Sequence, residues 1–180
     1  TALHAGTLDS PPEIPVYQIA PANTLNDWAD AMIRLGSATG RDAAAQYLTS
    51  TVTRRIAGVR ARVGIEPPTR ALILTPEGYT FGADAWITDL LTEAGGVNVA
   101  AEAGYDDVRQ IDDAAIAELA PDVILLTPGW GDDSPEFDGI DARIVPLAFE
   151  PTAPRDPGGE AVALAIALHP RAMLKLELGR

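Results

Sequence analysis

The residues best suited to bind a ligand lie in three loops, each of which follows a run of apolar residues. These aromatic and cationic residues are Tyr79, Phe81, Trp86, Trp130, Phe149 and Arg155. Aromatic rings offer an apolar surface to a flat or bulky ligand. A guanidinium group can pair with an anionic group such as a carboxylate or a catecholate. We therefore predict that these six residues bind a ligand.

Most of these residues also have a purely structural interpretation. Trp86 stands where the first buried residue of a following helix is expected, and Tyr79 and Phe81 fit core positions equally well. Trp130 lies between two glycines, so it has few sequence neighbours to bury it. Arg155 also fits an ordinary surface position. The sequence leaves these alternatives open.

Residues for catalysis or metal binding are scarce. The chain has no cysteine, and neither His4 nor His169 has a partner at metal-ligand spacing. It contains neither Gly-x-Ser-x-Gly nor a phosphate-binding loop. The acidic stretch around Asp132-Asp133 lacks the spacing of a calcium loop, which favours a solvated loop. We predict no catalytic residue, no metal site and no cofactor.

Composition narrows the class of partner. The net charge of −13 argues against nucleic acid and against a basic membrane-binding surface. Hydrophobic residues make up 47% of the chain, enough for a sizeable core. No apolar run is long enough to cross a membrane. A small molecule or a protein is the expected partner.

The elements that position these loops alternate between strands and helices. Continuous apolar runs predict buried strands at 70–75, 122–127 and 143–148. Helical segments are expected at about 85–94, 113–120 and 159–169. This alternation predicts an α/β fold, a three-layer lobe with a mainly parallel sheet. Ligands of such sheets bind beyond the carboxyl ends of the strands, where the three loops begin.

A long helix is predicted before the sheet. A capping box at Thr24–Asp27 opens a first helix, and a second runs from Asp42 to Val63. The apolar stripe of the second helix consists of Leu48, Val52, Ile56, Val59 and Val63.

Other local patterns mark the ends of elements. Gly95-Gly96 is predicted to end a helix, Asn98 to bond local backbone, and Asp112 to cap a helix. Residues 15–20 form a short strand candidate without a partner strand.

Several of these pieces, in this order, resemble the ABC-transporter solute-binding proteins that capture iron-siderophore complexes, heme or cobalamin. The matching pieces are 14–17, 35–45, 70–75, 95–98, 121–125, 145–147 and 168–170. The resemblance implies a remnant of an N-terminal lobe at 1–23, interlobe helices at 24–66 and a C-terminal α/β lobe at 67–180. It also implies a first lobe before Pro15, so we expect the chain to be a piece of a longer protein.

The resemblance further implies a function. Such proteins hold their ligand between two lobes and deliver it to an ABC permease, outside the cytoplasm. Contact with the membrane is expected only through an anchor outside this chain, a lipid attached to the full-length protein. An iron-siderophore complex is the preferred ligand. Heme stays open through Tyr79, because heme-binding members often ligate iron with Tyr, His or Met, and cobalamin stays open because it suits aromatic walls.

The same resemblance implies an acidic residue that docks to the permease, at the start of the helix leading to Pro121. The aligned position is Ala114, which cannot form an ion pair, so we assign the role to the neighbouring Asp113. The structural alternative is that Asp112 and Asp113 stabilise the helix N-terminus through its dipole.

Two other classes of function stay open on the sequence alone. The first is an enzyme with a related doubly wound fold, for which the acidic strand-end residues would be Glu77, Asp84, Asp132 and Glu150. The second is a protein-interaction domain without a small ligand.

Overall fold

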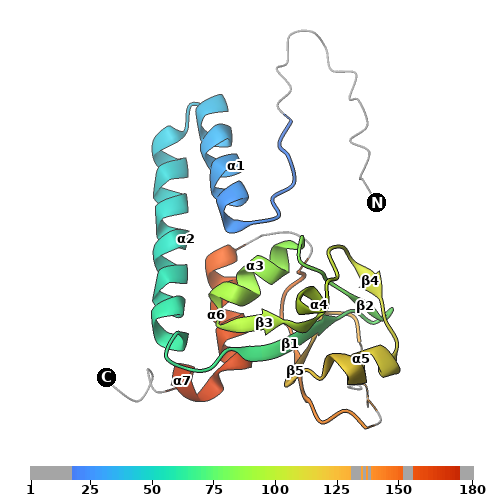
Figure 1. Cartoon of the computed structure of the whole chain (residues 1–180). Coiled ribbons are helices and arrows are strands. Elements are labelled where there is room, and N and C mark those ends of the chain that lie inside the picture. The colour runs from blue at the N-terminus through green and yellow to red at the C-terminus, as the bar shows by residue number, and fades with distance from the viewer. Residues whose placement is uncertain (1–17, 131–134, 136, 138, 152–155, 175–180) are drawn as a thin grey trace.

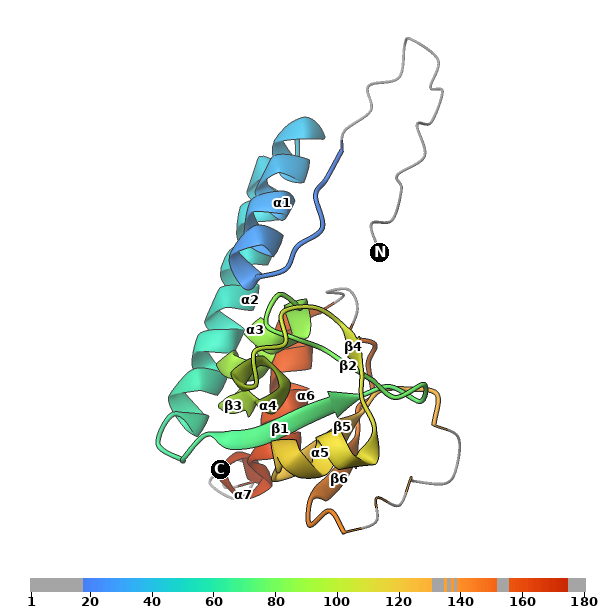
Figure 2. The same cartoon turned by 45° about the vertical axis from the view of Figure 1, so that its right-hand side comes forward.

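The computed structural model describes residues 18–130, 135, 137, 139–151 and 156–174. Within them, a pair of long helices stands beside an α/β lobe, and the upper half of the pair projects beyond that lobe (Figure 1, Figure 2). Helices α3 (Trp86–Glu93) and α6 (Pro157–Leu168) lie between the pair and the sheet.

The helical hairpin consists of α1 (Leu25–Ala38) and α2 (Asp42–Val63). The predicted capping box is confirmed, since Thr24 Oγ1 accepts from the Asp27 amide at 3.1 Å and the Asp27 carboxylate accepts from the Thr24 amide at 3.0 Å. The predicted bounds of α2 are also confirmed. The two helices approach closely at Gly36, where a Cβ would lie 2.5 Å from that of Ala45.

The apolar stripe of α2 is confirmed only along its lower part. Val52, Ile56, Val59 and Val63 are buried, whereas Leu48 is 45% exposed. The prediction for Leu48 was wrong because this turn of α2 lies in the projecting half of the hairpin, beyond the lobe (Figure 1).

The main sheet has four parallel strands in the order β3-β1-β5-β6. Their bounds are β1 (Thr69–Leu74), β3 (Gly96–Asn98), β5 (Val123–Leu126) and β6 (Arg143–Pro146). The three strands predicted from apolar runs are therefore confirmed. The mainly parallel sheet of the predicted fold class is confirmed with them.

Helices cover both faces of this sheet. One face packs against α2, α3 (Trp86–Glu93) and α6 (Pro157–Leu168), through Ala71 and Ile73 of β1. The other packs against α4 (Val99–Glu102) and α5 (Asp113–Leu119), through Leu72 and Leu74. Alternate residues of β1 therefore enter two separate cores, which gives the three layers predicted. Burying each large aliphatic side chain contributes about 1.5–3 kcal/mol.

Some elements were not predicted. A two-stranded antiparallel ribbon joins β2 (Tyr79–Thr80) to β4 (Arg109–Gln110), and a short α7 (Pro170–Leu174) follows α6. The strand candidate at 15–20 is wrong for residues 18–20, which have no strand, and its other residues lie outside the described part. No helix in the described part of the chain is long and apolar enough to span a membrane.

The predicted helix stop at Gly95-Gly96 is confirmed. Gly95 has a φ of +81°, and a Cβ there would lie 2.8 Å from a methyl carbon of Val63 and 2.9 Å from Nε2 of His169. Nε2 of His169 in turn lies 3.0 Å from the Gly95 carbonyl oxygen. The left-handed backbone and the close approach of two other elements both require glycine here.

Replacing Ile56 by Asp should lower the free energy of unfolding by about 3 kcal/mol or more, because it buries a carboxylate in the apolar contact of α2 with the lobe. Chemical denaturation measures the loss. Leu48→Asp is the matched control on the same helix and should cost under about 1 kcal/mol. Equal losses for the two variants would contradict the packing described above.

Replacing Gly95 by Ala should lower the free energy of unfolding by about 2–4 kcal/mol, from backbone strain together with the collision with Val63 and His169. Gly104→Ala separates the two causes, since Gly104 has a φ of +82° but nothing within 4 Å of a Cβ. That control should cost only about 1–2 kcal/mol. If Gly104→Ala costs as much as Gly95→Ala, the collision contributes nothing.

Candidate functional site

The carboxyl ends of three strands meet at one edge of the sheet. In the parallel register, Leu74 of β1 pairs with Leu126 of β5, which pairs with Pro146 of β6. The loops that follow these residues therefore start side by side. This edge is where a ligand of a parallel sheet is expected.

The first loop is a tight turn that presents Tyr79. The Thr75 amide donates to the Tyr79 carbonyl at 2.9 Å, and the Tyr79 amide donates to Thr75 Oγ1 at 3.2 Å. Gly78 has a φ of +77°, which permits the turn. Tyr79 is 40% exposed, so its ring is available on this edge.

The second loop lies against the first. Gly129 has a φ of +110°, and a Cβ there would lie 3.2 Å from Cγ of Pro76. The half-buried Trp130 packs on the core between the sheet and α5, and its Nε1 lies 3.4 Å from the Leu74 carbonyl oxygen. The predicted exposure of Trp130 is thus partial, with one part of the ring fixed at the end of β1.

The remaining predicted ligand residues are placed differently. Phe81 and Trp86 are 6% and 4% exposed and belong to the core beneath α3, so they have little surface to offer a ligand. Phe149 is half-buried and packs against the same core. Arg155 lies outside the described residues.

The β2–β4 ribbon adds residues that the sequence did not indicate. The guanidinium of Arg109 lies 4.7 Å from the ring centre of Tyr105, and Gln110 Nε2 donates to the Glu77 carbonyl at 3.0 Å. The bond of Gln110 ties β4 to the loop before β2, and the contact of Arg109 ties β4 to the segment that precedes it. The only sign of these contacts in the sequence is the spacing of Tyr105 four residues before Arg109. That spacing does not reveal which strand β4 pairs with.

A buried polar network holds the loop between β2 and α3. Asn98 Nδ2 lies 2.7 Å from both the Phe81 carbonyl oxygen and Thr88 Oγ1, and Thr88 Oγ1 donates to the Gly82 carbonyl at 2.7 Å. Asn98 Oδ1 also accepts from the Ala100 amide at 3.0 Å, which confirms its predicted bond to local backbone. Asn98 therefore fixes the loop as well as its own helix.

Asp113 lies in the first turn of α5 and is exposed. The predicted helix cap is confirmed, since the carboxylate of Asp112 accepts from the Ala115 amide at 2.9 Å. Asp113 is thus not needed for the cap hydrogen bond. Its carboxylate is accessible to a partner.

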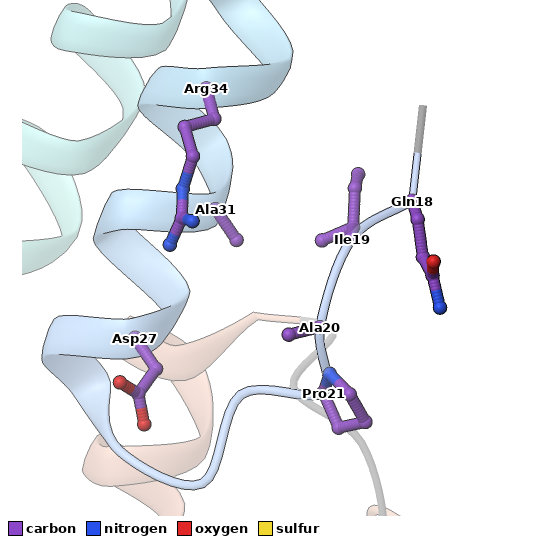
Figure 3. A pocket seen from close by; sticks show the side chains of 7 residues that line it. All are labelled: Gln18, Ile19, Ala20, Pro21, Asp27, Ala31 and Arg34. Atoms are coloured by element: carbon purple, nitrogen blue, oxygen red, sulfur yellow. The ribbon is translucent and has the colours of Figure 1, made fainter. Parts of the chain in front are cut away.

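A hollow lies away from the strand ends, between residues 18–21 and α1 (Figure 3). Its volume is about 90 Å³, and Ile19, Ala31 and Arg34 are among the residues that line it. The carboxylate of Asp27 at its base is already bonded to the amide of Thr24. This hollow is small and lies apart from the strand ends.

The chemistry of the strand-end wall suits binding. The wall consists of the partly exposed rings of Tyr79, Trp130 and Phe149. In the described part of the chain, no group of three or more His, Cys, Asp or Glu residues could hold a metal ion. Aromatic surface with a few polar groups is typical of a small-molecule site.

Known structures share this fold. The apo form of the periplasmic heme-binding protein RhuT from Roseiflexus sp. RS-1 is 22% identical, with a TM-score of 0.72 over 83% of this chain and 65% of that one. Helicobacter pylori CeuE in a Ni-His complex is 17% identical, with a TM-score of 0.74 over 87% and 55%. A periplasmic heme-binding protein from Pseudomonas aeruginosa is 21% identical, with a TM-score of 0.68 over 83% and 61%.

The chain therefore spans about 55–65% of the length of these three proteins. Among curated proteins, none matches it with statistical significance. The sequence model for periplasmic binding proteins matches residues 9–142, which is most of the chain. Together with the fold, this match shows that the chain belongs to the periplasmic binding protein family.

Proposed function

We propose that this chain is the C-terminal lobe and interlobe hairpin of an extracytoplasmic solute-binding protein that captures an iron-siderophore complex for an ABC importer. The observation that carries the proposal is the aromatic wall at the aligned strand ends, on a fold shared with periplasmic binding proteins. The division into a lobe remnant at 1–23, a hairpin at 24–66 and a lobe at 67–180 belongs to the same proposal, as does a lipid anchor outside the chain.

The geometry favours a ligand shared between two walls. Tyr79, Trp130 and Phe149 lie on or beside a single edge of the lobe, and each retains some exposed surface. One such edge covers only one side of a bulky ligand, whereas drug-sized ligands usually bury most of their surface. A second lobe in the family-length protein would supply the opposite wall.

Heme is the second candidate, and one residue favours it. Tyr79 is 40% exposed at the strand ends, so its phenol oxygen could ligate a heme iron. Two of the structural neighbours are heme-binding proteins. Cobalamin fits the same aromatic surface but has no residue here that favours it over the others.

Titration of the family-length protein with a ferric siderophore, heme and cobalamin tests the proposal. Tyr79→Ala and Trp130→Ala should each weaken binding of the true ligand by roughly tenfold or more, because each removes aromatic contact surface. The present chain alone should bind far more weakly. Tight binding by this chain alone would contradict the shared cleft, and no binding by the family-length protein would contradict the function.

Two controls accompany this titration. Phe81→Ala should lower the free energy of unfolding by about 3–5 kcal/mol, as expected for a core aromatic residue, with a smaller effect on affinity. Tyr79→Phe separates the ligands, because it keeps the ring and removes the phenol. It should change the visible spectrum of bound heme and leave siderophore binding nearly unchanged.

Asp113 is the proposed permease-docking acid. Asp113→Ala should reduce ligand uptake by the intact transport system while leaving ligand affinity and the melting temperature nearly unchanged, since the residue is exposed and outside the cap hydrogen bond. Asp112→Ala is the matched control and should cost about 1 kcal/mol of stability through loss of the cap. Normal uptake by Asp113→Ala would remove this residue from the docking surface.

A further inference from the structure

We propose that α3 couples the strand-end loop at 81–85 to the helical hairpin, with Thr88, Asp89 and Glu93 as positioning residues. The proposal rests on the proposed function in one respect, namely that a bound ligand would displace the loop. The coupling itself is a property of contacts within this chain.

The hairpin is attached to α3 at two points. The carboxylate of Asp89 accepts from the Leu25 amide at 2.7 Å. Leu25 begins α1, and the first amides of a helix have no partner within it. A carboxylate at this end also interacts favourably with the helix dipole. Asp89 thus holds the start of α1 against the lobe.

The second attachment is an ion pair with α2. Glu93 accepts two hydrogen bonds from Arg60, one of them from Nε at 2.8 Å. The side chain of Glu93 is only 13% exposed, so the pair is partly shielded from water. Hydrogen bonding to Glu93 and then its charge raise the pKa of Arg60, and the charge of Asp89 adds to the effect. Asp89 and Glu93 are four residues apart and share one face of α3.

A groove lies between the helical hairpin and α3, which are joined by the bonds of Asp89 and Glu93. It has a volume of about 250 Å³ and is lined by α1, α2 and α3, including Leu25, Trp28 and Ile56. Val59 and Val63 anchor the lower turns of α2 in the core. Trp28 of α1 and Ile56 of α2 are also buried in this core. Apolar packing therefore holds the hairpin on the lobe, and Asp89 and Glu93 add directional polar contacts across the groove.

The opposite attachment of α3 is to the strand-end loop. Thr88, next to Asp89 in sequence, donates to the Gly82 carbonyl and accepts from Asn98. The N-cap residue Ala85 makes no side-chain cap, so Thr88 supplies the side-chain bond that holds this end of the loop. Gly82 also lies close to the neighbouring loop, since a Cβ there would be 2.5 Å from the Asp106 carbonyl.

The helix between these attachments is rigid enough to transmit a displacement. Ile87, Leu90 and Leu91 are fully buried, and close-packed elements move as units rather than deform. A shift of the loop must then move Thr88, and with it Asp89 one residue away. The start of α1 follows through its bond to Asp89.

Pulsed electron paramagnetic resonance can measure this coupling in the chain without any ligand. This 180-residue chain has no cysteine, so Tyr47→Cys and Glu118→Cys provide its only two labelling sites. Tyr47 is 71% exposed on the projecting half of α2, and Glu118 is exposed on α5 of the lobe. This labelled protein should give one narrow distribution of distances.

Thr88→Val and Asp89→Ala should each shift or broaden that distribution. Thr88→Val is the decisive variant, because Thr88 bonds the loop and not the hairpin. Conservative changes should restore the narrow distribution, since Thr88→Ser keeps the hydroxyl and Asp89→Asn keeps an acceptor oxygen. Glu102→Gln is the matched control, because it breaks the ion pair with Arg70 inside the lobe.

A melting curve for each variant separates displacement from unfolding. An unchanged distribution for folded Thr88→Val would overturn the coupling, even if Asp89→Ala broadens it. Broadening by Glu102→Gln would also overturn it, by showing that any lost ion pair has this effect. Because no ligand is added, failure of the proposed ligand binding would leave the result of this experiment unaffected.

Discussion

The structure depends on the burial of both faces of β1. Ala71, Leu72 and Ile73 are each fully buried, yet alternate side chains enter different cores. A strand in that position needs covering layers on each side and paired strands at each edge. The helices α3 and α6 on one face, α4 and α5 on the other, and β3 and β5 beside it meet that need. The aligned strand ends follow from the same parallel register.

The parts of the fold that the sequence predicts correctly are those in which local pattern and tertiary packing agree. Within the run at 70–75, residues 71–74 are all apolar and all buried, which requires a strand covered on both sides. The capping box at Thr24–Asp27 and the cap at Asp112 are completed within a few residues. Gly95 ends α3 for reasons that are partly local, through its positive φ.

The errors arise where burial depends on distant parts of the chain. Leu48 continues the stripe of α2, but periodicity cannot show that the lobe stops below it. Phe81 and Trp86 are of the residue types expected in a binding site, but both are buried in the core beneath α3. The β2–β4 ribbon joins short polar segments about thirty residues apart, and neither has a strand pattern of its own. Such pairings become visible only in three dimensions.

The difference between partly exposed and fully buried positions explains which aromatic residue occupies each of them. Tyr79 and Trp130 combine an apolar ring with a polar group, so they can lie at a boundary where one part is packed and another faces solvent. Phe81 has no polar group and gains most from full burial. Behind it, Asn98 donates to the Phe81 carbonyl and Thr88 donates to the Gly82 carbonyl. A buried polar network therefore holds the start of the loop that follows Tyr79. Helix α3 contributes Thr88 to that network and, on another side, the carboxylates that hold the hairpin.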